Sequence, residues 1–229
     1  KRQELSFAEK VFFCNSGAEA VEGAIKIARK FQSFKGSIER NEIITFKNSF
    51  HGRTLATLAA ASNSLHTEGF NPIPDGFVNI PLDENILKKT ISDKTAGILI
   101  EPVQGEGGIN PVSNEFLVFI RKLCDENKIL MILDQVQCGM GRTGKLFSHE
   151  WSGIEPDIVT LAKGLGAGFP IGAVLASEEA SKGMQQGSHG STFGGNPVGC
   201  SIALKVIELI EKEEILNNLL VNLIYLLQH

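Results

Sequence analysis

Short apolar runs alternate with stretches of helical spacing along most of this chain of 229 residues. Several of the runs contain no polar alternation, as expected for strands that are covered on both faces. This alternation predicts an α/β fold, with a mainly parallel seven-stranded sheet and helices on both of its faces. The seven strands are expected at residues 11–14, 42–46, 77–81, 96–100, 129–133, 157–161 and 171–176.

Helices are expected at residues 19–34, 84–90 and 114–127, and over the last stretch at 198–227. The apolar face of that last stretch continues to residue 227 without a cap, and such a face must be buried against another element. We therefore expect residues 1–229 to form one large domain, of which 198–229 lead towards a C-terminal domain that the chain lacks.

Charge and cysteine content narrow the class of protein. The 22 Lys and Arg against 26 Asp and Glu give a net charge of -4, so no basic stripe is available for nucleic acid. No apolar run approaches the ~18 residues of a membrane span. The cysteines are too scattered for a zinc site or a disulfide framework, which favours reduced thiols and a cytoplasmic location; they are Cys14, Cys124, Cys138 and Cys200.

In open α/β sheets, ligands bind beyond the carboxyl ends of the strands. The first expected strand runs into Asn15-Ser-Gly-Ala-Glu19 and then a helix, so the N–H groups of Gly17 and Ala18 could hold a phosphate. Ser16 and Glu19 also fit a capping box, and the two interpretations are compatible.

Two further strand ends carry ionisable side chains. Asp134 follows the apolar run 129–133, where a carboxylate is either a loop cap or a partner for a cation. Lys163 follows the run 157–161 between Ala162 and Gly164. An amine enclosed by such small, apolar neighbours loses solvation and becomes nucleophilic, although most lysines simply lie at the surface.

Other patterns are weaker. Gly139-Met-Gly-Arg-Thr-Gly144 has the spacing of a dinucleotide-binding loop, but it begins five residues after Asp134 and no suitable helix follows. The five histidines lack metal-ligand spacing. The loops at 50–53 and 190–197 could offer an aromatic ring, a guanidinium and hydroxyls to a ligand, or could be an ordinary turn and a glycine-rich loop.

Six motifs follow one another along the chain: NSGAEA (15–20), FHGRT (50–54), EPVQGEGG (101–108), LDQVQCG (133–139), LAKGLGAGFPIGAV (161–174) and GSTFGGNP (190–197). In this order and spacing they resemble the class III, fold-type-I aminotransferases, from about Val11 to Leu209. Within that class the last two motifs are most similar to acetylornithine-type members, and ornithine, succinylornithine and 4-aminobutyrate enzymes share most of the six.

The resemblance implies pyridoxal 5′-phosphate (PLP) as the cofactor. Lys163 would bind it covalently and then act as general acid and base, and Asp134 would keep its pyridine nitrogen protonated. The other residues that would contact PLP are Gly17, Ala18, Phe50, Gln135, Val136, Gln137 and Thr192, the last from the neighbouring subunit of a homodimer.

The resemblance also implies a reaction, the transfer of the terminal amine of N-acetylornithine to 2-oxoglutarate. Arg53 would clamp a substrate carboxylate and Ser191 would line the same region. Glu106 would mask an arginine of the C-terminal domain, but no arginine follows Arg142, and Val21 replaces a usual asparagine. A nicotinamide oxidoreductase and an inactive, dimerising scaffold stay open as alternatives.

Overall fold

The computed structural model describes residues 7–61, 63–212 and 215–216 of the chain. Within this part, seven strands form the central sheet in the order β1-β9-β8-β7-β4-β2-β3. Each strand expected from the sequence is present, so the predicted fold class is confirmed. The strands are β1 (Lys10–Cys14), β2 (Glu42–Phe46), β3 (Phe77–Ile80), β4 (Thr95–Ile100), β7 (Leu130–Asp134), β8 (Ile158–Leu161) and β9 (Gly172–Ala176).

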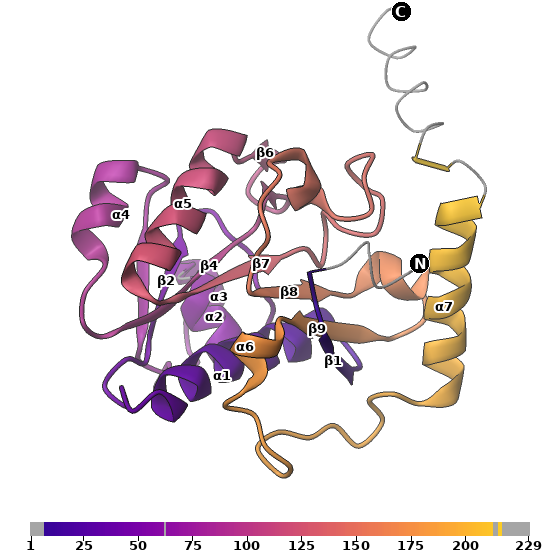
Figure 1. Cartoon of the computed structure of the whole chain (residues 1–229), viewed down its shortest axis with the longest axis horizontal. Helices are drawn as coiled ribbons and strands as arrows, with labels where there is room; N and C mark the ends of the chain where they lie inside the picture. Colours follow the sequence, from indigo (N-terminus) through magenta and orange to yellow (C-terminus); the bar gives the residue numbers. More distant parts are fainter. Residues whose placement is uncertain (1–6, 62, 213–214, 217–229) are drawn as a thin grey trace, which may run out of the picture.

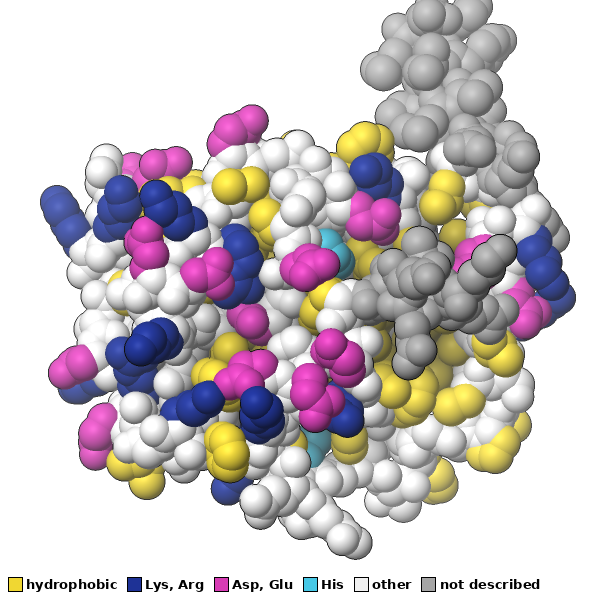
Figure 2. Space-filling model, in the orientation of Figure 1, with side chains coloured by type: hydrophobic (Ala, Val, Ile, Leu, Met, Phe, Trp, Pro, Cys, Tyr) yellow, Lys and Arg dark blue, Asp and Glu magenta, His cyan; other side chains and the backbone are white. Residues whose placement is uncertain are grey.

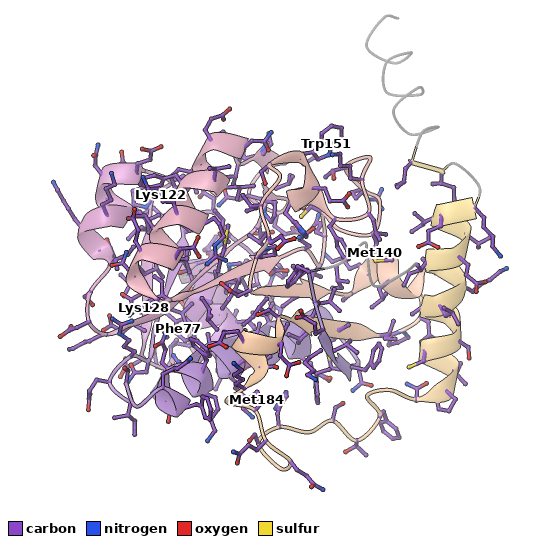
Figure 3. All side chains as sticks on the ribbon, viewed as in Figure 1. Phe77, Lys122, Lys128, Met140, Trp151 and Met184 are labelled. Carbon is purple, nitrogen blue, oxygen red and sulfur yellow. The ribbon has the colours of Figure 1, made fainter. Side chains whose placement is uncertain are left out.

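The direction of the strands decides where a ligand can bind. Strands β3, β2, β4, β7 and β8 are parallel to one another, and β9 is antiparallel to both β8 and β1. Every strand except β9 therefore ends at the same edge of the sheet. Lys128, before β7, and Met140, after it, lie at opposite ends of the sheet in Figure 3 and mark its amino and carboxyl edges.

Two apolar cores flank the sheet, because successive strand residues point to opposite faces. Ile43 lies in the core beneath helix α1 (Gly17–Phe34), whereas its neighbour Ile44 lies in the core beneath helix α5 (Asn114–Asn127). Helix α2 (Leu55–Ala61) packs beside α1, and helix α4 (Glu84–Thr90) beside α5 (Figure 1). This burial on both faces explains why the central strands β4, β7 and β8 are mostly apolar.

The remaining elements are short except for one. They are the helices α3 (Ser64–Thr67) and α6 (Glu178–Ser181), the 3₁₀ helices η2 (Ser148–Trp151) and η3 (Lys163–Gly166), the two-stranded pair β5 (Val103–Gln104) and β6 (Asn110–Pro111), and the long helix α7 (Pro197–Lys212).

Helix α7 confirms the first half of the helix expected at 198–227, and the stretch beyond residue 216 lies outside the described residues. It packs against η3 at one side of the molecule (Figure 1). Val198 and Leu204 on this helix are exposed. Hydrophobic side chains gather over this part of the face in Figure 2, whereas charges of both signs intermingle elsewhere on it. Among the helices of the described residues, none is both long and apolar enough for a bilayer crossing.

Candidate active site

A cavity of about 340 Å³ opens at the carboxyl edge of the sheet, and we call it the lysine cavity. The segments that follow β1, β2, β4, β7 and β8 line it, together with the turn before β9. The fold thus brings to one place Gly17 and Lys163, which lie 146 positions apart in the chain. The expected site residues that line the cavity are Gly17, Ala18, Phe50, Asp134, Val136, Gln137 and Lys163.

Asp134 ends β7 and is almost fully buried, with 3% of its surface exposed. Its Oδ2 accepts a hydrogen bond from His51 Nδ1 at 2.8 Å. Its Oδ1 accepts bonds from Thr160 Oγ1 at 3.0 Å and from the Val136 N–H at 3.1 Å. These three donors hold the carboxylate at the floor of the lysine cavity, at the end of a rigid strand.

Lys163 begins η3, directly after β8 and Ala162. The expectation that small neighbours enclose its amine is wrong, because the side chain is exposed in this chain. Its Nζ donates to Gln137 Oε1 at 2.9 Å. The amine therefore lies beside the segment that also carries Asp134, within reach of the cavity and of solvent.

Helix α1 starts at the cavity wall. Ser16 is the N-cap, and its Oγ accepts the Glu19 N–H at 3.2 Å. The Glu19 side chain accepts the N–H of Asn15 at 2.8 Å, whereas in an ordinary capping box it would accept the N–H of the N-cap residue itself. The N–H groups of Gly17 and Ala18, in the first turn, have no partner within the helix. A Cβ on Gly17 would lie 2.7 Å from Val136 Cγ1, so only glycine lets the helix start this close to the β7 segment.

Phe50 separates the lysine cavity from a second cavity of about 810 Å³, which we call the arginine cavity. Arg53 and Glu106 both line this second cavity. The Arg53 guanidinium lies over the Phe50 ring, with its central carbon 5.3 Å from the ring centroid. The structure thus places the expected carboxylate clamp next to the lysine cavity, with a carboxylate beside it.

Three expected residues lie elsewhere. The Gln135 side chain does not line the lysine cavity, because it turns into the interior, where its Oε1 accepts the Ser148 N–H at 2.7 Å and its Nε2 lies 2.6 Å from His149 Nδ1. Ser191 and Thr192 line a separate cavity of about 400 Å³. Ser191 still connects to the site, since its Oγ accepts a hydrogen bond from Asn15 Nδ2 at 3.1 Å.

Sequence reasoning missed two buried residues of the lysine cavity, His51 and Glu101. His51 bonds Asp134, and its Nε2 is buried without a hydrogen-bond partner. Burial, and then the negative charge of Asp134, raise the pKa of Glu101 to about 7. Its position in the sequence could have identified Glu101, because it directly follows β4, and ligand-binding residues of such sheets lie just beyond the strand ends.

The loop at 139–144 does not form a dinucleotide site. Turns follow one another over these residues, and the next helical element is η2, a 3₁₀ helix of four residues. A pyrophosphate therefore finds no helix N-terminus there, and the nicotinamide alternative loses its structural basis.

An amine, a buried carboxylate and a helix N-terminus thus line one cavity at the carboxyl edge of a mainly parallel sheet, an arrangement that suits the cofactor site of a fold-type-I enzyme. The family model for class-III aminotransferases matches residues 2–229. The chain therefore belongs to the class-III aminotransferases.

Three relatives illustrate the similarity. Acetylornithine aminotransferase of Brucella melitensis is 54% identical over 94% of this chain and 54% of its own length. Acetylornithine aminotransferase of Methanocaldococcus jannaschii is 55% identical over 93% of this chain and 54% of its own length. The structure of Toxoplasma gondii ornithine aminotransferase with partial occupancy of PLP has a TM-score of 0.89 at 34% identity, over 94% of this chain and 52% of that chain. This chain spans about half the length of the relatives it matches.

Proposed function

We propose that this chain binds PLP and that the protein transfers the terminal amino group of N-acetylornithine to 2-oxoglutarate. The observation that carries the proposal is the placement of the Lys163 amine and the buried Asp134 carboxylate in one cavity. The names of the Brucella and Methanocaldococcus relatives support the donor, and the Toxoplasma structure supports the cofactor.

The residues of the lysine cavity fit PLP. A carboxylate can accept about four hydrogen bonds, and Asp134 accepts three, which leaves one acceptor position for a protonated ring nitrogen. Phe50 and Val136 offer apolar surfaces to a planar ring. The first N–H groups of α1 and its positive helix end suit the phosphate.

When bound, PLP supplies an aldehyde carbon that takes up the amino group and a ring that accepts electrons. Lys163 would remove the proton from the substrate carbon that bears the amine and return it on the cofactor side. Gln137, which accepts a hydrogen bond from Lys163 Nζ, would orient that amine. Asp134 would hold a proton on the ring nitrogen, and its own burial keeps water from competing for this contact.

The arginine cavity would bind the rest of the donor. A guanidinium forms two parallel hydrogen bonds with a carboxylate, and Arg53 is exposed to this cavity. Glu106 places a negative charge in the same cavity, and it would repel the carboxylate of the donor and favour its binding at Arg53. Ornithine, succinylornithine and 4-aminobutyrate are the alternative donors.

We also propose that the chain is the cofactor-binding domain of a homodimer with shared active sites, located in the cytoplasm. Thr192 is exposed and outside its own chain's lysine cavity, as a residue that serves a neighbouring subunit must be. All four cysteines are free thiols, which supports a reducing compartment.

The test is to add PLP to the purified chain, reduce it with borohydride and map the labelled peptide. We expect new absorbance in the visible range and a pyridoxyl group on Lys163. Lys163→Ala should lose the label, whereas Lys205→Ala, on the exposed surface of α7, should keep it. A label on another lysine, or none, would contradict the proposal.

The donor is tested separately. N-acetylornithine, ornithine, succinylornithine and 4-aminobutyrate are each mixed with the PLP-loaded chain, and the spectral change is followed. We expect the fastest change with N-acetylornithine, and a slower one after Arg53→Lys, which keeps the charge but not the paired hydrogen bonds. A faster reaction with one of the other three amines would assign the donor differently.

A further inference from the structure

Glu101 is a buried carboxyl group that the proposed chemistry does not use. It is 3% exposed and lines the lysine cavity at the end of β4. Its Oε2 accepts the backbone N–H of Phe50 at 2.8 Å. An ionisable side chain in such a place must serve a purpose that offsets the cost of burying it.

The segment from Lys47 to Gly52 is fixed at three points. Gln104 Nε2 donates to the Lys47 carbonyl at 2.8 Å and to Ser49 Oγ at 3.2 Å. Glu101 then holds the Phe50 N–H, and Asp134 holds the His51 ring.

Two carboxyl groups from neighbouring strands β4 and β7 thus hold two successive residues, Phe50 by its backbone and His51 by its side chain. The chain changes direction directly after His51, because Gly52 has a φ of 136°, which no helix or strand continues. A residue with a Cβ there would also approach the Ala18 Cβ to 2.8 Å. The orientation of Phe50 therefore depends on the anchors themselves and not on a continuing helix or strand.

We propose that Glu101 is a positioning residue for the cofactor site. Through the Phe50 N–H it fixes the turn that presents the Phe50 ring to the lysine cavity and the His51 imidazole to Asp134. This inference rests on the proposed function for its cofactor, whereas the anchoring of the turn can be tested without PLP. Without the Glu101 oxygen, the Phe50 N–H loses its partner and the turn can shift.

The role needs an acceptor oxygen and not a negative charge. The groups that face Glu101 are Asp134 on β7, His51 on the turn, and the backbone N–H groups of Phe50 and Gly105. A protonated Glu101 keeps a carbonyl oxygen for Phe50 and places no second negative charge beside Asp134. The raised pKa of Glu101, at about 7, agrees with this arrangement. A glutamine, which has the same shape and no charge, should therefore replace Glu101.

The experiment compares Glu101→Gln, Glu101→Leu and Glu101→Asp in the full chain. The readouts are the dissociation constant of PLP and the hydrogen exchange of the 47–52 segment measured without PLP. We expect Glu101→Gln to stay within about threefold of the wild type in both. Glu101→Leu should bind PLP at least ten times more weakly and exchange the Phe50 N–H at least ten times faster.

Glu101→Asp keeps the charge but draws the acceptor oxygen back by one carbon, so we expect it to resemble Glu101→Leu in both readouts. It is the decisive variant if the leucine protein does not fold.

Gln32→Leu is the matched control. Gln32 is equally buried and donates to the Ala96 and Lys128 carbonyls at the amino edge of the sheet, so its loss should lower stability and leave PLP affinity within threefold.

A PLP affinity and an exchange rate unchanged in Glu101→Leu and Glu101→Asp would overturn the inference. So would a glutamine variant that is weaker than the aspartate variant, since that order would assign the role to the charge. If the wild type does not bind PLP, the proposed function fails, and unchanged exchange in the variants would then separately refute the anchoring.

Discussion

Lys163 adopts a left-handed backbone conformation, with a φ of 42°. A residue with a Cβ is disfavoured there by roughly 1–2 kcal/mol, and such strain is typical of functional sites. Two nearby residues share the feature, Met140 at 54° and Ala167 at 45°. The site is thus held in shape by the surrounding sheet and not by local preference.

This conformation predicts a difference in stability between two variants that lack the Lys163 amine. Lys163→Gly should be more stable than Lys163→Ala by about 1 kcal/mol, because glycine adopts a positive φ without the steric cost of a Cβ. Urea denaturation of both proteins measures the difference. Equal stabilities, or a more stable alanine variant, would show that the backbone at this position is not strained.

The charge of Asp134 is expected to matter more than its shape. Asp134→Asn should still bind PLP but react with the amino donor roughly 10²-fold more slowly, equivalent to about 3 kcal/mol, because a neutral amide does not hold the ring nitrogen protonated. Rapid mixing of the PLP-loaded chain with donor gives the rate.

The control for this charge is Asp157→Asn. Asp157 binds Arg121 at 2.8 Å and the Met131 N–H at 2.7 Å, before the start of β8, so its loss should lower stability and leave the rate unchanged. A normal rate in Asp134→Asn would remove the proposed role.

At the scale of elements, helix α1 contributes both to the core and to the candidate site. Its apolar side fills one core of the sheet, and its first turn faces the lysine cavity. The Ser16 cap fixes where the helix begins, and thereby where the N–H groups of Gly17 and Ala18 point.

We expect Ser16→Ala to lower the free energy of unfolding by about 1 kcal/mol and to weaken PLP binding as well. The matched control is Ser113→Ala, which removes the equivalent cap of α5, where Ser113 Oγ accepts the Phe116 N–H at 3.1 Å. It should lose similar stability without a change in PLP affinity, since Ser113 does not line the lysine cavity. Equal effects of both variants on PLP binding would argue against phosphate binding by α1.

At the scale of the whole molecule, two buried groups make stability depend on pH in opposite directions. Burial lowers the pKa of His149 from 6.5 to about 4, so the folded state resists protonation and stability is lost as the pH falls from 6.5 towards 4. The pKa of Glu101 is raised from 4.5 to about 7, so its contribution is present below 4.5 and is lost as the pH rises through 7. Each contribution is about 3 kcal/mol, and between 4.5 and 6.5 they offset one another.

Glu101→Gln removes one of these two opposed contributions. Relative to the wild type, the free energy of unfolding of this variant should rise more steeply with pH, by up to about 3 kcal/mol between pH 4.5 and 7. Denaturant titrations at several pH values measure the difference. Parallel pH profiles for the two proteins would mean that Glu101 titrates normally in the folded state.

The strands and the long helices could be predicted from the sequence because their signals are local. Strands buried on both faces are apolar at most positions, and α4 and α5 begin directly after capping residues, Asp83 and Ser113. Lys163, Asp134 and Gly17 could be found because strand ends in such a sheet converge on one edge.

The tertiary structure alone decided the rest, because those features depend on direction and on contacts between distant residues. Nothing in the order Asp134-Gln135-Val136-Gln137 indicates that the Gln135 side chain turns inward while Gln137 reaches Lys163. The pairing of His51 with Asp134 and of Glu101 with Phe50 joins segments more than fifty residues apart. The sequence by itself determined which chemical groups arrive at the edge of the sheet, since periodicity and burial are properties of each segment. Which of those groups touch, and which lose their water, was decided only when the segments packed together.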